Sequence, residues 1–202
     1  MGLTLANQMT IARMVMIPLL MMLVLSNHSG WALLVFVLAS LTDALDGIIA
    51  RRYRQSSALG AFLDPMADKL LMTACFIVLS VPDHPQSFPE FEAPNHLPIY
   101  LTIVTISRDV FIVMIALVIH LTSGLTRFTP TFLGKVTTVT QMITIGVVLL
   151  VNYLGQEALV LVQALVWLTL ALTLASGLHY IYHATQMAGG NEPARPEGPD
   201  AA

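Results

Sequence analysis

Six long apolar stretches constrain the fold of this chain more than any other feature. They cover residues 5–26, 31–50, 65–81, 97–120, 131–154 and 159–182 of the 202 residues. A helix of about 20 apolar residues crosses the roughly 30 Å hydrocarbon core of a bilayer. With 56% hydrophobic residues and a mean hydropathy of +0.76, the composition excludes an ordinary soluble globule. The sequence therefore predicts an all-α integral membrane bundle of six transmembrane helices.

Basic residues fall in alternate connections of this bundle. They follow the second stretch, at 51–54, and flank the start of the fifth, at 127–135, whereas 26–30, 81–98 and 152–158 contain no Lys or Arg. Cytoplasmic connections of membrane proteins carry an excess of Lys and Arg. We therefore expect both termini, and the 51–54 connection, to be cytoplasmic.

One segment, residues 40–71, concentrates charge in a chain of which only 10% is charged. Its charged residues are Asp43, Asp46, Arg51, Arg52, Arg54, Asp64, Asp68 and Lys69. Hydrocarbon tolerates such groups only when they face one another, a metal or water. The segment is therefore the predicted functional site.

The four carboxylates form two pairs at helical spacing. Asp43 and Asp46 share one face near the end of the second helix, and Asp64 and Asp68 share a face of the third. A loop at 51–60 is expected between them, with Pro65 in the first turn of the third helix. Bare carboxylates at this distance repel, and a divalent cation removes the repulsion. Four such oxygen ligands suit Mg²⁺, Mn²⁺ or Ca²⁺ rather than zinc.

Two further sets of polar residues each have two interpretations. Asn7, Thr10 and Arg13 recur every three residues, so they either anchor the first helix at the interface or form a polar wall of the site. Arg108 and Asp109 lie near the middle of the fourth stretch, where an Arg must point into the bundle. They form either an internal ion pair or a site for an anionic group of a substrate.

The remaining polar and reactive residues are expected to be structural. Cys75, the single cysteine, should be a packing residue. His84 and His96 belong to a predicted outer loop, and the His and Tyr residues at 179–183 to an aromatic belt at the membrane interface. Residues 188–202 should form a disordered tail after a domain of residues 1–187.

The charge-rich segment matches a known motif, D-x2-D-G-x2-A-R-x8-G-x3-D-x3-D. Its fixed positions are Asp43, Asp46, Gly47, Ala50, Arg51, Gly60, Asp64 and Asp68. This pattern resembles the signature of the CDP-alcohol phosphatidyltransferases, and weaker similarity extends from residue 5 to residue 182.

The resemblance implies an enzyme of phospholipid biosynthesis, a transferase that moves a phosphatidyl group from CDP-diacylglycerol to an alcohol and releases CMP. It also implies a homodimer, here in a bacterial inner membrane, with the active site on the cytoplasmic side. The expected partners are the lipid substrates and the bilayer, and no nucleic acid.

The resemblance also assigns roles to residues. Two divalent metal ions, Mg²⁺ or Mn²⁺, would be bound by Asp43, Asp46, Asp64 and Asp68, with Asp68 as the catalytic general base. The CDP group would be bound by Asp46, Gly47, Arg51, Gly60 and Asp64. Residues expected to bind the acceptor are Arg108, Lys135 and Arg13.

Two acceptors remain open. N-x-x-T-x-x-R at 7–13, L-D-P-M-A-D-K at 63–69 and G-K-V-T-T at 134–138 are similar to phosphatidylglycerophosphate synthases, whose acceptor is glycerol 3-phosphate. This is the acceptor that we expect. I-S-R-D-V at 106–110 and P-T-F-L-G-K at 130–135 resemble the cardiolipin synthases of the same family, whose acceptor is phosphatidylglycerol.

Three residues depart from the first pattern: Asp109 replaces a Glu, Ile115 an Arg and Thr137 a Lys. An ion or proton transporter is the alternative from another class, because intramembrane Asp and Arg residues also mark transport pathways. That alternative predicts charges at the midplane of an internal repeat. This sequence has no apparent repeat, and its charge-rich segment lies towards one face.

Overall fold

The computed structural model describes the backbone of residues 5–53, 58–81, 95–123 and 131–189, and the side chains of 10–42, 66–81, 95–115, 131–182 and Thr185. Within these ranges the structure is entirely helical. The helices are α1 (Leu5–Leu25), α2 (Ser29–Tyr53), α3 (Ala58–Leu79), α4 (Ile99–Ser123), α5 (Phe132–Tyr153) and α6 (Leu159–Gly189). The all-α prediction is confirmed, and each helix lies on one of the six apolar stretches.

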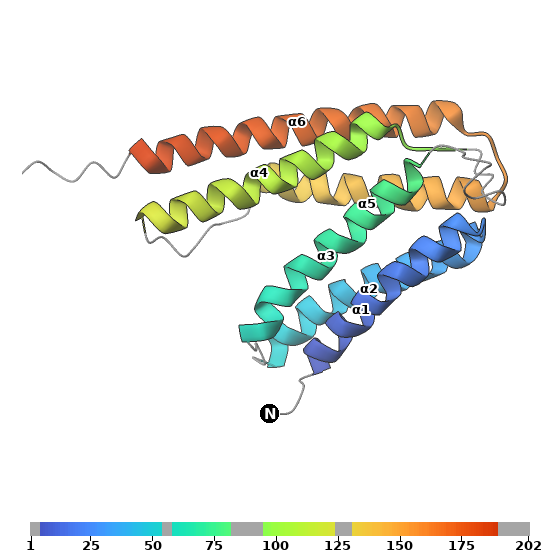
Figure 1. Ribbon diagram of the computed structural model, residues 1–202, viewed down its shortest axis with the longest axis horizontal. Coiled ribbons are helices and arrows are strands. Elements are labelled where there is room, and N and C mark those ends of the chain that lie inside the picture. Colours follow the sequence, from blue (N-terminus) through green and yellow to red (C-terminus); the bar gives the residue numbers. More distant parts are fainter. Residues whose placement is uncertain (1–4, 54–57, 82–94, 124–130, 190–202) are drawn as a thin grey trace, which may run out of the picture.

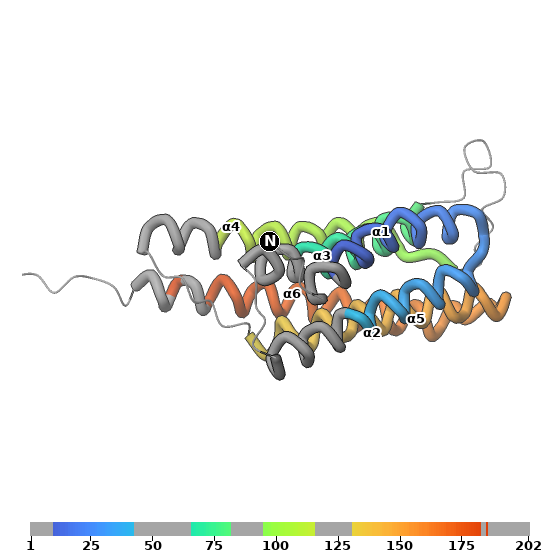
Figure 2. Tube along the Cα trace, turned by 90° about the horizontal axis from the view of Figure 1, so that it is seen from below, coloured from blue at the N-terminus to red at the C-terminus, as the bar shows by residue number. Residues whose placement is uncertain are grey.

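The helices form two layers. α1, α3 and α4 lie in one layer and α2, α5 and α6 in the other (Figure 2). α1 packs on both α2 and α3, α6 packs on α4 and α5, and α2 contacts α5. At one end the 26–28 turn, the start of α4 and the 154–158 turn come together, and from there α1–α3 diverge from α4–α6 (Figure 1). The C-terminal ends of α2 and α6 and the N-terminal end of α3 lie away from this end of the molecule (Figure 1).

A pair of asparagines joins the layers at the end where the turns meet. The backbone N–H and Nδ2 of Asn95 both donate to Oδ1 of Asn152, each at 3.1 Å. In return Nδ2 of Asn152 donates to the Asn95 carbonyl at 3.0 Å, and Nδ2 of Asn95 donates to the Gln156 carbonyl at 2.9 Å. We call these two residues the asparagine clamp. It ties the segment before α4 to the end of α5.

Hydroxyl groups connect α5 to α6. Thr137 donates to the Leu172 carbonyl at 3.2 Å, and Thr144 and Thr169 share a hydrogen bond of 2.8 Å. These side chains are buried. Interhelical hydrogen bonds of this kind replace the hydrophobic driving force that is missing between helices in lipid.

The outer surface is strongly apolar. Large hydrophobic side chains such as Val15, Val37, Phe111 and Leu178 are exposed on all six helices, as expected of a surface that faces lipid or a partner. Within the described ranges, Phe132–Tyr153 and Leu159–Tyr182 are long and apolar enough to cross a bilayer. Six spans and cytoplasmic termini stay predictions.

Some predicted helix boundaries were wrong. α2 continues through Tyr53 and α3 begins at Ala58, so most of the predicted 51–60 loop is helical. Pro65 consequently lies inside α3 and not in its first turn. Proline has no N–H, so the carbonyl four residues earlier loses its helical donor. Helix formers such as Ala, Leu and Arg around these boundaries outweigh that loss.

α6 is also longer than predicted. It reaches Gly189, seven residues past the predicted end at 182 and two residues into the segment assigned to the tail. Residues 190–202 lie outside the described part of the chain, so the disorder predicted for them stays a prediction. Cys75 is fully buried in the core, as expected of a packing residue.

Candidate functional site

The residues of the charge-rich segment lie on two helices. Asp43, Asp46, Gly47 and Arg51 belong to α2, and Gly60, Asp64 and Asp68 belong to α3. Both helical backbones are continuous there, so the spacing of each pair of positions is that of residues on one side of a helix. The end of α2 and the start of α3 lie away from the asparagine clamp (Figure 1).

Only one of the four carboxylate side chains, that of Asp68, is described, and it is partly exposed. Asp43, Asp46 and Asp64 lie outside the described side chains. The described ones contain no group of three or more His, Cys, Asp or Glu residues that could hold a metal. The donor set, two carboxylate pairs on helices, fits hard divalent cations. The four-carboxylate metal site stays a prediction.

A positively charged cavity begins one residue after Asp68. It has a volume of about 400 Å³ and receives side chains from α3, α4, α5 and α6. Its lining is Lys69, Arg108, Ile112, Thr131, Gly134, Lys135, Thr138, Val139 and Tyr180. We call it the basic pocket. Three cations line it, and none of the described residues in its lining is an acid.

An ion-pair chain fixes two of these cations. Nζ of Lys69 lies 2.8 Å from Oδ2 of Asp109, and NH1 of Arg108 lies 2.8 Å from Oδ1 of the same carboxylate. NH2 of Arg108 donates to Oγ of Ser176 at 2.6 Å. The chain links α3, α4 and α6. One carboxylate neutralises one of the two cations, so the pocket keeps a positive charge to which Lys135 adds.

Arg108 is suited to receive an anion. Its side chain is only 8% exposed, and its Nε is buried without a hydrogen-bond partner among the described residues. A buried donor without an acceptor carries a desolvation cost of about 1–3 kcal/mol.

The N-terminus of α5 adds to the positive field. Thr131 is its N-cap, with an extended backbone (φ −68°, ψ 149°), and Oγ1 accepts from the Gly134 N–H at 3.2 Å. A helix N-terminus carries about half a positive charge. A Cβ at Gly134 would lie 3.4 Å from NH2 of Arg108, so glycine lets the guanidinium approach the helix end. The arrangement suits a phosphate group.

A comparison with protein families identifies the fold. The CDP-alcohol phosphatidyltransferase family profile matches residues 3–175. The chain belongs to this family. The match contains the whole motif on α2 and α3, together with Arg108 and Lys135.

Three curated relatives of this chain carry different names. The cardiolipin synthase (CMP-forming) of Rattus norvegicus is 32% identical over 89% of this chain, which spans 61% of that protein's length. The CDP-diacylglycerol–glycerol-3-phosphate 3-phosphatidyltransferase of Bacillus subtilis is 30% identical to this chain. The match covers 87% of this chain and 92% of the length of that protein. A probable phosphatidylglycerophosphate synthase of Mycobacterium tuberculosis is also 30% identical, and the match covers 92% of this chain and 84% of the length of that protein.

The structure brings together some of the residues expected to bind the acceptor. Arg108 and Lys135 line the basic pocket, whereas Arg13 does not. Arg13 is 1% exposed on α1, beside the equally buried Thr10, so it does not snorkel to the surface. Its position favours the polar-wall interpretation. Arg108 and Asp109 do form the predicted ion pair, and the same Arg108 faces the pocket.

Sequence reasoning missed three residues in or beside the basic pocket. Lys69 was seen only as part of a charged segment, because its partner Asp109 is 40 residues away. Ser176 lies on a nearly uncharged helix, 68 residues from Arg108. Tyr180 was assigned to the aromatic belt, but it lines the pocket. The α-helical spacing of Ser176 and Tyr180, four residues apart, was the available signal.

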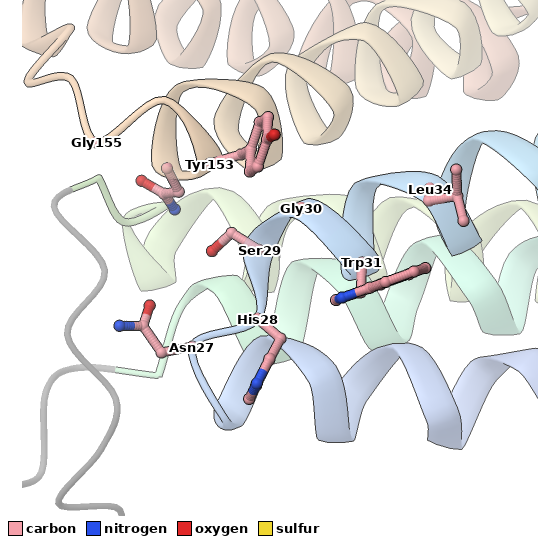
Figure 3. A pocket seen from close by; sticks show the side chains of 9 residues that line it. Asn27, His28, Ser29, Gly30, Trp31, Leu34, Tyr153 and Gly155 are labelled. Atoms are coloured by element: carbon pink, nitrogen blue, oxygen red, sulfur yellow. The ribbon is translucent and has the colours of Figure 1, made fainter.

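A second cavity, shown from close by in Figure 3, lies beside the start of α2 and the end of α5. It has a volume of about 680 Å³ and is lined by residues of the 26–28 turn, the start of α2 and the end of α5, including His28 and Tyr153. Its described lining residues include no Lys, Arg, Asp or Glu. It therefore lacks the charge that a phosphate site needs.

Proposed function

We propose that this chain transfers a phosphatidyl group from CDP-diacylglycerol to the hydroxyl of a glycerol phosphate, and releases CMP. The observation that carries the proposal is the basic pocket, which begins at Lys69, directly after the last carboxylate of the family motif. An acceptor held there by its phosphate would present its hydroxyl towards Asp68. Membership of the family favours this transferase over an ion or proton transporter.

The donor would lie on the motif of α2 and α3. Asp43, Asp46, Asp64 and Asp68 would hold two Mg²⁺ or Mn²⁺ ions, which neutralise the pyrophosphate charge and stabilise the leaving group. Arg51 offers a planar fork to the same phosphates. Gly47 and Gly60 allow the nucleotide to approach the backbone closely.

In the proposed reaction the acceptor oxygen attacks the phosphorus of the phosphatidyl group. The bond from this phosphorus to the CMP oxygen breaks, and its electron pair leaves with CMP. Asp68 accepts the proton of the acceptor hydroxyl, as a general base within hydrogen-bond reach can do. The basic pocket holds the acceptor in position beside the donor, so the attack proceeds like a step within one molecule.

The acceptor phosphate would rest among Lys69, Arg108 and Lys135. Two alcohols of the proposed class carry glycerol joined to a phosphate. Glycerol 3-phosphate is the acceptor that the sequence motifs favour, and phosphatidylglycerol is the alternative. One relative is named for each of the two reactions, and each of them matches most of this chain.

We further propose the setting of the reaction. Six spans in a bacterial inner membrane, with both termini cytoplasmic, would put the motif within reach of lipid phosphates and of the cytosol. A homodimer would cover part of the exposed apolar surface, which a monomer presents to lipid alone.

The test is CMP release by the purified protein from CDP-diacylglycerol, with and without Mg²⁺ or Mn²⁺. We expect activity only with the metal, and Asp68→Asn should lower kcat by about 10²–10⁴-fold, since it removes the base. Glu157→Gln, an exposed acid in the 154–158 turn, serves as the control. Full activity in chelator, or a wild-type rate for Asp68→Asn, would refute the proposal.

A further inference from the structure

A second depression on α4 and α6 adjoins the basic pocket. It has a volume of about 280 Å³ and is lined by residues 103–115 of α4 and 173–181 of α6. Most of these residues are apolar, among them Ile103, Phe111 and Leu178. We call it the apolar groove. It shares Arg108, Ile112 and Tyr180 with the basic pocket, so the two depressions lie side by side.

The groove has the length of a lipid tail. Its α4 wall runs from Ile103 to Ile115, which is about 18 Å at the helical rise of 1.5 Å per residue. One leaflet contributes about half of the 30 Å hydrocarbon core. Ile103, Phe111 and Leu178 are 57%, 62% and 69% exposed, so the groove opens on the apolar surface and not into the bundle.

Arg108 belongs to both depressions through different parts of its side chain. A Cβ built on Gly177, in the wall of the groove, would lie 3.7 Å from Cγ of Arg108. NH2 of the same residue reaches Ser176 and the helix end at Gly134. The apolar stem therefore faces the groove and the charged head faces the pocket. A ligand with an anionic head and an apolar chain matches this order.

We infer that the acceptor is an anionic lipid, with its phosphate in the basic pocket and one acyl chain in the apolar groove. This inference rests on the proposed function and narrows its acceptor to the class of phosphatidylglycerol. Glycerol 3-phosphate would fill the pocket alone and leave the groove to bulk lipid. The acyl chains of the donor are a weaker match, because the donor phosphates belong to the motif on α2 and α3.

Two variants obstruct the groove and leave every charged residue of the basic pocket unsubstituted. Gly177→Leu projects a side chain into it, and a Cβ at this position meets only an ordinary contact. Ile103→Trp narrows its far end. Ala175→Leu on α6 and Val113→Trp on α4 are the matched controls, since both positions are exposed and neither lines the groove.

The experiment compares three acceptors in detergent micelles containing CDP-diacylglycerol. They are phosphatidylglycerol, its deacylated head group glycerophosphoglycerol, and glycerol 3-phosphate. We expect both groove variants to lower kcat/KM for phosphatidylglycerol by at least about tenfold, the effect of losing about two buried methylene groups. The low activity with glycerophosphoglycerol and the KM for CDP-diacylglycerol should not change, and the controls should match wild type.

Several results would overturn the inference while leaving the proposed function intact. One is that the protein uses glycerol 3-phosphate but not phosphatidylglycerol. Another is that the groove variants behave like their controls. A third is that the groove variants lose activity equally with glycerophosphoglycerol and with phosphatidylglycerol. A raised KM for CDP-diacylglycerol in the groove variants would assign the groove to the donor. Absence of CMP release with every acceptor would instead refute the proposed function itself.

Discussion

At the scale of single residues, Arg108 is the side chain on which most of the site geometry converges. Its guanidinium is held by Asp109 and Ser176 and lies against Gly134, while the buried Nε has no hydrogen-bond partner within the described part of the chain. Arginine presents its donors in a planar fork, which lysine cannot reproduce. The charge of residue 108 alone is therefore not sufficient for its proposed role.

The variant Arg108→Lys tests this. It keeps the positive charge but loses the fork, so KM for the acceptor should rise by about 10–100-fold, the worth of one or two charge-assisted hydrogen bonds. KM for CDP-diacylglycerol should stay near the wild-type value. Steady-state kinetics with each substrate varied in turn measures both constants, and Lys135→Arg, which also keeps its charge, is the comparison. An unchanged acceptor KM would show that Arg108 does not hold the acceptor.

At the scale of helices, α2 and α5 approach each other closely at one glycine. Tyr153 of α5 stands over the backbone of α2 at Gly30 (Figure 3). A Cβ at Gly30 would lie 2.6 Å from two ring carbons of Tyr153, which is closer than packed carbon atoms approach. Glycine at this position thus permits the close packing of the two helices that join the halves of the bundle.

Gly30→Ala should consequently destabilise the protein by about 1–3 kcal/mol, since overpacking displaces the ring or the helix. In a Tyr153→Ala background the sign should reverse, because alanine is the better helix former and nothing remains to collide with it. Thermal unfolding of the four proteins in detergent gives the interaction between the two sites. If Gly30→Ala has the same effect in both backgrounds, the predicted contact is wrong.

At the scale of the whole molecule, the two layers are joined at one end, and the basic pocket lies towards the other end. The asparagine clamp joins the segment before α4 to the end of α5. The basic pocket lies near the N-terminus of α5, a helix length away. Stability and activity should therefore be separable.

Asn152→Ala removes three hydrogen bonds of the clamp and leaves polar groups of Asn95 buried, so the expected loss of stability is about 1–3 kcal/mol. A lower melting temperature in detergent would show it, with Gln163→Ala on the exposed face of α6 as the control. Below the melting temperature KM for the acceptor should equal that of wild type. A changed KM would mean that the clamp also shapes the pocket.

Much of the fold was predictable, because apolar length and helical spacing are local properties. Each of the six helices follows an apolar stretch, and the Arg108–Asp109 ion pair was foreseen from the cost of a charge in hydrocarbon. The 51–60 loop was not predicted correctly, because Pro65 suggested a helix start and favourable helix formers around it override that signal. Lys69, Ser176 and Tyr180 were missed because their contacts join distant parts of the chain.

The hydroxyl contacts between α5 and α6 bear on how the protein enters its membrane. Thr137 and Thr144 on α5 bond to α6 across the short 154–158 turn, and both helices are long and apolar enough to span. A polar side chain entering lipid without a partner is costly, and a neighbouring helix removes that cost. We therefore expect α5 and α6 to insert as one helical hairpin during biosynthesis, after the four preceding helices have left the ribosome.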